Sequence, residues 1–118
     1  MIEPVEIDAA PNSVWDLLRA EAQLGADEGQ ATVLSESRGR ELLLDVRMGI
    51  GFHVQHAYRI ERRGDGCTVS DRIRPIGWRW RLSNVFLFGR GIRPIEAAAE
   101  QGLRNLKAAA EDRSVSGS

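Results

Sequence analysis

The chain has 118 residues, of which 42% are hydrophobic, and this suits one domain with one core. Its 16 basic and 17 acidic residues give a net charge of -1 and form no long block of either sign, which argues against nucleic acid or an anionic membrane as a partner. The single cysteine, Cys67, excludes an intrachain disulfide and a multi-cysteine metal site. Because the sequence shows neither a signal peptide nor an apolar run of about 18 residues, we expect a cytoplasmic protein without membrane insertion.

The N-terminal part of the chain predicts one strand and one helix. Residues Ile2–Asp8 end on alternating apolar and acidic positions, which is typical of a strand. Because proline is tolerated in the first turn of a helix, we predict a helix from Pro11 to about Ala22. Its apolar face would consist of Val14, Trp15, Leu17 and Leu18. The following segment, Leu24–Gly29, contains two glycines and two acids and is predicted to be a loop.

From Ala31 onward the apolar residues recur at every second position, which is the period of a strand. Turns that contain glycine divide this part of the chain into antiparallel hairpins. The predicted strands are Ala31–Ser37, Glu41–Met48, Phe52–Arg62, Cys67–Arg74 and Trp78–Ser83. The last two contain the only local concentration of basic residues, which we interpret as a solvated strand face rather than a phosphate-binding patch: Arg72, Arg74, Arg79 and Arg81.

The run Pro94–Asp112 has the longest helical period in the sequence. Its predicted buried stripe consists of Ile95, Ala99, Gly102, Leu103, Leu106 and Ala110. Because glycine inside a helix costs about 1 kcal/mol relative to alanine, we interpret Gly102 as a point of close approach to a sheet or a ligand. The alternative interpretation is a tolerated glycine at an exposed position. Residues 113–118 are polar and predicted to be a disordered tail, which leaves 1–112 as the domain.

The order of these elements indicates an α+β fold, in which a curved antiparallel sheet of about six strands closes on the C-terminal helix. Three parts of the chain resemble the START-like superfamily, which includes bacterial polyketide cyclase/dehydrase and lipid-transfer proteins. They are IDAAPNSVWDLL, SESRGRELLLDVRM with HAYRIERRGDGCTVS, and RPIEAAAEQGLRNLKAAAE. The resemblance covers nearly the whole chain and implies a helix-grip fold, with a cavity for an apolar ligand between the sheet and the C-terminal helix.

The chain also departs from this superfamily. Members usually carry an additional helix or loop and a strand pair after the first helix, whereas here only Glu21–Thr32 fills that space. We therefore expect a sheet that is short by one or two strands. Because proteins normally cover an unpaired strand edge, we expect either a wider cavity mouth or a homodimer in which a second copy covers the edge.

The hairpin around Arg63–Gly66 predicts a polar cluster inside the fold. Keeping the apolar residues of both strands on the buried face predicts three cross-strand pairs: Ile60 with Val69, Tyr58 with Asp71, and His56 with Ile73. In the preceding hairpin, inward-facing Met48 and Val54 predict Val46 opposite His56 and Leu44 opposite Tyr58. Asp71 is then expected to accept a hydrogen bond from Tyr58 or His56, because a buried unpaired carboxylate is costly.

Two classes of function are compatible with this cluster. The first is a module that binds a polyketide-, lipid- or terpenoid-like molecule. Its predicted cavity wall consists of Leu44, Val46, Met48, Val54, Ile73, Trp78, Trp80, Gly102, Leu103 and Leu106. The second is a polyketide cyclase, aromatase or dehydratase without a cofactor, in which His56 is a general acid or base, Asp71 orients it and Tyr58 donates to a substrate carbonyl.

A purely structural interpretation is the alternative to both, because buried polar groups often only fix the packing of a sheet. The sequence contains no motif for a nucleotide, a phosphate or a metal. His53 and His56 are spaced as HxxH, which on a strand directs them to opposite faces, so we predict that they share no metal.

Overall fold

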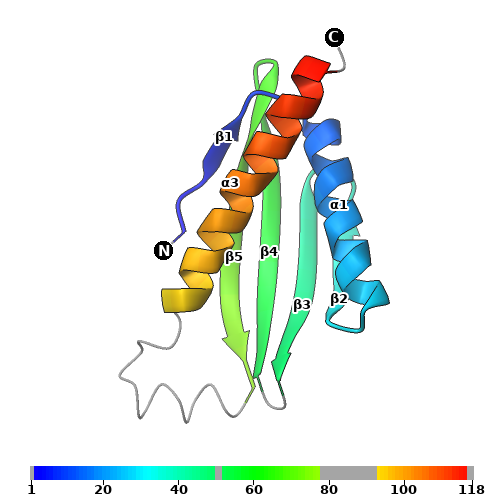
Figure 1. The fold of residues 1–118 in the computed structure, drawn as a ribbon, viewed down its shortest axis with the longest axis vertical. Helices are drawn as coiled ribbons and strands as arrows, with labels where there is room; N and C mark the ends of the chain where they lie inside the picture. The colour runs from blue at the N-terminus through cyan, green and yellow to red at the C-terminus, as the bar shows by residue number, and fades with distance from the viewer. Residues whose placement is uncertain (1, 50–51, 78–92, 117–118) are drawn as a thin grey trace.

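The computed structural model describes residues 2–49, 52–77 and 93–116 (Figure 1). In these ranges the chain is an α+β structure that consists of β1 (Val5–Ile7), α1 (Pro11–Asp27), β2 (Ala31–Ser37), β3 (Glu41–Gly49), β4 (Phe52–Arg63), β5 (Gly66–Ile76) and α3 (Arg93–Ser116). The strands pair antiparallel in one open sheet of order β1-β5-β4-β3-β2. Both helices lie on the same face of this sheet, with α3 packed on β1 and β5 and α1 packed on β2 (Figure 1).

The hairpin strands lie where the apolar period predicted them. β2 has the predicted bounds, β3 and β4 are each one residue longer at the C-terminal end, and β5 is longer by one residue at its start and two at its end. The predicted strand Trp78–Ser83 lies outside the described residues. At the C-terminal end, α3 continues to Ser116 and therefore extends into the segment that was predicted to be a disordered tail.

The predicted loop over Leu24–Gly29 is wrong, because α1 continues to Asp27. A side-chain hydrogen bond stabilises the C-terminal end of α1. Gln23 donates it to Asp27, one helical turn away, at 2.8 Å. Gly25 fits inside the helix because the first residue of β2 lies close by, and a Cβ at Gly25 would be 3.0 Å from the Cβ of Ala31. The helix ends before Gly29, whose φ of 74° is the left-handed conformation that terminates many helices.

The core lies between the two helices and the face of the sheet that they cover. Trp15 anchors it from α1 and is 4% exposed, as predicted for this tryptophan. The stripe of α3 supplies the opposite side, and its buried members are Ala99, Leu103, Leu106 and Ala110. Apolar burial of this kind is the main driving force for holding both helices on the sheet.

Gly102 does not belong to the buried stripe of α3, so the predicted close approach is wrong. The residue is exposed, and a Cβ at its position would meet no atom within 4 Å. Gly102 lies at the margin of the stripe, next to the buried Leu103, where helical spacing alone leaves its orientation open. The alternative interpretation, a tolerated glycine at an exposed position, agrees with the structure.

The predicted register of the β4–β5 hairpin is confirmed. Ile60 lies opposite Val69, Tyr58 opposite Asp71, and His56 opposite Ile73. The turn between the strands contains Gly64, whose φ of 58° lets the chain reverse tightly and fixes the register.

The predicted register of the β3–β4 hairpin is wrong by two residues. Leu44 lies opposite His56 and Leu42 opposite Tyr58, and a shift between Arg47 and Gly49 displaces the pairing by one residue of this difference. An irregularity of this kind inserts an extra residue into one strand and moves every pair beyond it. Since a slip of two residues keeps each side chain on its face of the sheet, Leu44 still shares a face with His56.

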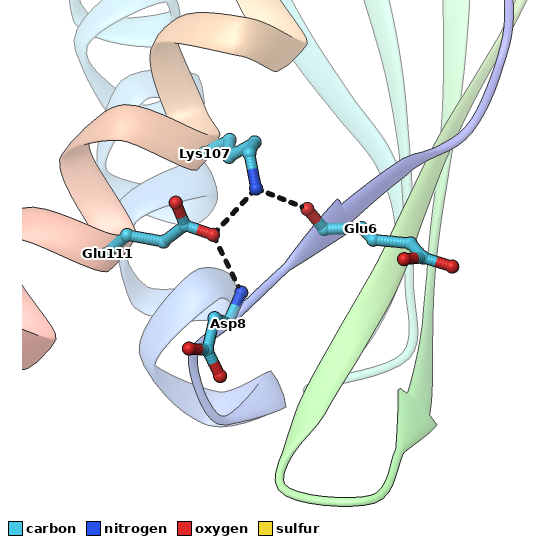
Figure 2. Close-up of polar contacts among 4 residues, drawn as sticks. All are labelled: Glu6, Asp8, Lys107 and Glu111. Carbon is cyan, nitrogen blue, oxygen red and sulfur yellow. Dashed lines mark hydrogen bonds and ion pairs between the residues drawn. The ribbon is translucent and has the colours of Figure 1, made fainter.

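A polar link joins the end of α3 to the junction of β1 and α1, as Figure 2 shows. Glu111 accepts a hydrogen bond from the backbone amide of Asp8 at 2.9 Å and one from the ammonium group of Lys107 at 2.7 Å. Lys107 also donates to the backbone carbonyl of Glu6 at 2.8 Å. The link therefore connects two segments that are far apart in the sequence, and we refer to it as the Lys107–Glu111 link.

This link predicts an acid-sensitive contribution to stability. The hydrogen bond from Lys107, followed by that from Asp8, lowers the pKa of Glu111 below its ordinary value of 4.5. A lowered pKa in the folded state means that the contribution is fully present above about pH 5.5 and is lost as the pH falls through the lower folded-state value. We expect Glu111→Gln to lower the free energy of unfolding at pH 7 and to differ less from the parent chain at pH 3, as measured by urea unfolding.

A matched surface variant serves as control for the Lys107–Glu111 link. Glu41 lies 4.0 Å from Arg59, and both side chains are 64% exposed, so Glu41→Gln is expected to leave the free energy of unfolding almost unchanged. An equal effect of Glu111→Gln at both pH values would show that the ionised carboxylate contributes nothing to the link.

Candidate functional site

The strongest candidate site is the polar trio of His56, Tyr58 and Asp71, which we call the trio. His56 and Tyr58 are two residues apart on β4, and Asp71 lies on the neighbouring strand β5. All three share the face of the sheet that packs on the helices, since their register partners include core residues on that face. The prediction that three polar groups face inward together is therefore confirmed.

A short hydrogen bond joins two members of the trio. His56 Nδ1 lies 2.8 Å from Asp71 Oδ2, and the two side chains are 15% and 1% exposed. Of the two hydrogen bonds predicted for Asp71, the diagonal one from His56 is the one that forms. A carboxylate can only accept, so Nδ1 carries the proton, and in the neutral imidazole Nε2 is left as an acceptor.

Tyr58 joins the trio through its ring. The rings of His56 and Tyr58 are stacked, with centroids 5.7 Å apart and planes 9° from parallel. Burial, followed by the charges of Asp71 and Glu21, raises the pKa of the Tyr58 phenol above its ordinary value of 10.0. Tyr58 therefore stays a neutral hydrogen-bond donor at physiological pH.

The carboxylate of Asp71 is only partly satisfied. The residue is 4% exposed, and its Oδ1 atom is buried and has no hydrogen-bond partner among the described residues. A buried, unpaired carboxylate oxygen is energetically unfavourable and is uncommon in folded proteins. An ordered water or a bound group can supply the missing interaction to such an atom.

Asp71 also lines a pocket of about 350 Å³ at the edge of the sheet. β1 pairs with β5 only from Cys67 to Val69, so among the described strands β5 has no neighbour on that side beyond Val69. The start of α3 and the residues before β1 surround this part of β5. The pocket is lined by Ile2, Pro4, Ser70, Asp71, Arg72, Ile73 and Glu96.

The structure distributes the predicted wall residues over several environments. Four are packed in the core: Leu44, Val54, Leu103 and Leu106. Val46 and Ile73 are half-buried against the core, and Ile73 also lines the pocket. Gly102 is exposed and is not a wall residue. The side chain of Met48 and the residues Trp78 and Trp80 lie outside the described part of the chain.

Sequence reasoning missed five residues of the pocket: Ile2, Pro4, Ser70, Arg72 and Glu96. Glu96 directly follows Ile95, the first residue of the predicted stripe. Its position in the first turn of α3 could therefore be predicted from the sequence. The sequence contains no signal that would bring Ile2 and Pro4 next to Ile73, because that contact depends on the short pairing between β1 and β5.

The second histidine lies on the opposite face of the sheet, as predicted. His53 Nδ1 lies 3.1 Å from Asp45 Oδ2, and the two side chains are 31% and 23% exposed. Each histidine therefore has its own carboxylate, on opposite sides of β4, which provides matched inner and outer His–Asp pairs for experiments.

Neither described helix combines the length and the apolarity that crossing a membrane requires. Comparison of the chain with models of protein families, with curated proteins and with solved structures finds no match.

Proposed function

We propose that the chain binds a small, mainly apolar molecule between β5 and the start of α3, next to the trio. The observation that carries this proposal is the buried Asp71, which holds His56 with one oxygen, leaves the other unpaired and lines a pocket. The apolar part of the lining comes from Ile2, Pro4 and Ile73, and a pocket of about 350 Å³ is in the range of small-molecule sites.

The resemblance to START-like proteins supports the same proposal. We propose that the fold is a shortened helix grip, in which α3 packs its apolar stripe on the inner face of the sheet. In that arrangement the ligand lies between the sheet and the C-terminal helix, and polyketides, lipids and terpenoids are the proposed classes of ligand. The homodimer also stays a prediction, with β2 as an edge strand of the described sheet available for covering.

The second candidate function is a cyclase or dehydratase without a cofactor. It is favoured by the 2.8 Å contact between His56 and Asp71, because a carboxylate that orients an imidazole is a common way to build a general base. In this function Nε2 of His56 takes the proton, Asp71 stabilises the imidazolium that forms, and Tyr58 donates to the substrate carbonyl.

Titration with Nile red, a neutral dye whose fluorescence responds to apolar surroundings, tests the binding function. We expect saturable binding that Ile73→Ser weakens about fivefold or more, because the change removes apolar wall from the pocket. Ile76→Ser is the matched control: it lies on the same strand, but the register places it on the other face of the sheet.

Two results would contradict the binding function: absence of saturable dye binding, or equal weakening by Ile73→Ser and Ile76→Ser. The variant His56→Asn separates binding from catalysis. Asparagine keeps a donor close to the position of Nδ1 and removes Nε2, so a catalytic His56 predicts loss of turnover with the dye affinity retained.

A further inference from the structure

A second pocket lies at the end of the sheet where α1 begins (Figure 1). It has a volume of about 480 Å³, and its described lining shares no residue with the pocket beside Asp71. The first turn of α1, the turn between β2 and β3, and the neighbouring ends of β3 and β4 form its walls. Its charged lining residues are four arginines and two glutamates: Arg38, Arg40, Arg59, Arg62, Glu41 and Glu61.

The turn between β2 and β3 is held between α1 and β4. Gly39 is buried with a φ of 76°, and a Cβ at this position would lie 2.9 Å from Asn12 Oδ1, so the contact with α1 requires glycine. The backbone amide of Ile60 donates to the carbonyl of Arg40 at 2.7 Å, which attaches the same turn to β4. The backbone of Arg38 and Arg40, on either side of Gly39, is therefore fixed at the wall of the pocket.

Strand alternation separates the charges that line this pocket. Ile60 is buried on the helix-facing side of β4, and Arg62, two residues further on, lies on that side too. Arg59 and Glu61 alternate to the outer side of the sheet. There Arg59 lies 3.2 Å from Glu61 and 4.0 Å from Glu41, so both glutamates of the lining already have a cationic neighbour.

The other three arginines of the lining are uncompensated. Among the described residues, no acid pairs with Arg38, Arg40 or Arg62, and the first turn of α1 contains no acidic side chain. Asp8 and Asp65 line a different pocket. The pocket therefore carries an excess of positive charge, in a chain whose net charge is -1.

The residue types in the lining indicate the class of ligand. Guanidinium groups present paired donors that match the oxygens of phosphates and carboxylates. A phosphate monoester carries a charge of about -1.5 to -2 at pH 7, whereas a carboxylate carries a single charge, so three uncompensated arginines favour phosphate. The described lining is mostly polar, and a volume of about 480 Å³ is in the range of small-molecule sites.

We propose that this pocket binds a small phosphorylated molecule, with Arg38, Arg40 and Arg62 donating to the phosphate oxygens. The phosphate lies between the β2–β3 turn and the end of β4. This site is separate from the apolar pocket beside Asp71 and goes beyond the proposed function, so either site can exist without the other.

Isothermal titration with inorganic pyrophosphate and malonate tests this assignment, since both molecules carry two anionic groups joined through one atom. At pH 7.5 and constant ionic strength we expect pyrophosphate to bind about tenfold or more tightly than malonate. Arg62→Gln should weaken pyrophosphate about fivefold or more, because it removes a charged donor. The matched control is Arg63→Gln, which removes the same charge from the next residue, on the outer side of β4, where Arg63 lies 3.7 Å from Glu6. It should weaken pyrophosphate by less than about twofold.

Four results would overturn this proposal. They are absence of pyrophosphate binding, binding of malonate at least as tight as that of pyrophosphate, equal weakening by Arg62→Gln and Arg63→Gln, and displacement of bound Nile red by pyrophosphate. Equal weakening would mean that the net charge of the chain, and not the pocket, attracts the anion. Displacement of Nile red would mean that both molecules occupy one site. Binding of a single-stranded oligonucleotide about tenfold tighter than that of pyrophosphate would assign the arginines to a nucleic-acid backbone and would also overturn the small molecule.

A second variant keeps the test decisive if Arg62→Gln does not fold, as judged by circular dichroism. Arg40 is exposed and reaches the pocket from the β2–β3 turn, and Arg40→Gln keeps the backbone carbonyl that accepts from Ile60. We expect Arg40→Gln to weaken pyrophosphate about fivefold as well. An unchanged affinity for pyrophosphate in this variant would overturn the proposal.

Discussion

Leu103→Ala is expected to lower the free energy of unfolding by about 2 to 5 kcal/mol, as truncation of a buried leucine does in well-packed cores. Leu103 is 2% exposed and lies in the middle of the stripe that holds α3 on the sheet. Alanine would leave a cavity between the helix and the inner face of the sheet. Urea unfolding followed by circular dichroism measures the loss.

The neighbouring residue provides the matched control for Leu103. Gly102 is exposed with no atom near its missing Cβ, so Gly102→Ala should raise the free energy of unfolding by about 0.5 to 1 kcal/mol through helix propensity alone. Two adjacent substitutions to alanine are thus expected to act in opposite directions. Destabilisation by both would mean that α3 is rotated about its axis relative to the structure described above.

His56→Ala is expected to lower the free energy of unfolding by about 3 kcal/mol, because it leaves Asp71 buried without any partner. The outer pair is the reference: His53 and Asp45 are 31% and 23% exposed, so His53→Ala should cost about 1 kcal/mol or less. The difference between the two losses in free energy of unfolding measures how much burial adds to the cost of removing the histidine.

The inner pair also predicts a coupling. Because removal of Asp71 relieves the buried charge, Asp71→Asn combined with His56→Ala should cost less than the sum of the two single changes. Additive costs, or equal costs for His56→Ala and His53→Ala, would show that the 2.8 Å contact contributes no more than a surface pair.

The trio could be located from the sequence because two independent constraints agree on the β4–β5 register. Alternation fixes which residues face the core, and a short turn with glycine fixes how far the strands are offset. The predicted register of the β3–β4 hairpin rests on alternation alone, with Met48 and Val54 facing inward. Its pairing shifts between Arg47 and Gly49, and alternation alone tolerates a displacement of two residues.

The helices show where periodicity stops being informative. Gly25 and Gly102 both interrupt a helical pattern, yet Gly25 is packed against Ala31 and Gly102 is exposed. Helix propensity treats the two residues alike, so only the neighbouring strand distinguishes them. For the same reason the pocket beside Asp71 could not be predicted, since Ile2 reaches it only through the short pairing of β1 with β5.

The Lys107–Glu111 link has a consequence for synthesis of the chain. Asp8 leaves the ribosome 103 residues before Glu111, whereas β2 to β5 are joined by hairpins between neighbours in the sequence. Contacts between close neighbours form early because little chain entropy is lost. The four-stranded meander can therefore assemble while α3 is still inside the exit tunnel. The part of the sheet's apolar face that α3 later covers is then exposed. During that interval the nascent chain offers a binding surface to chaperones, and docking of α3 removes it.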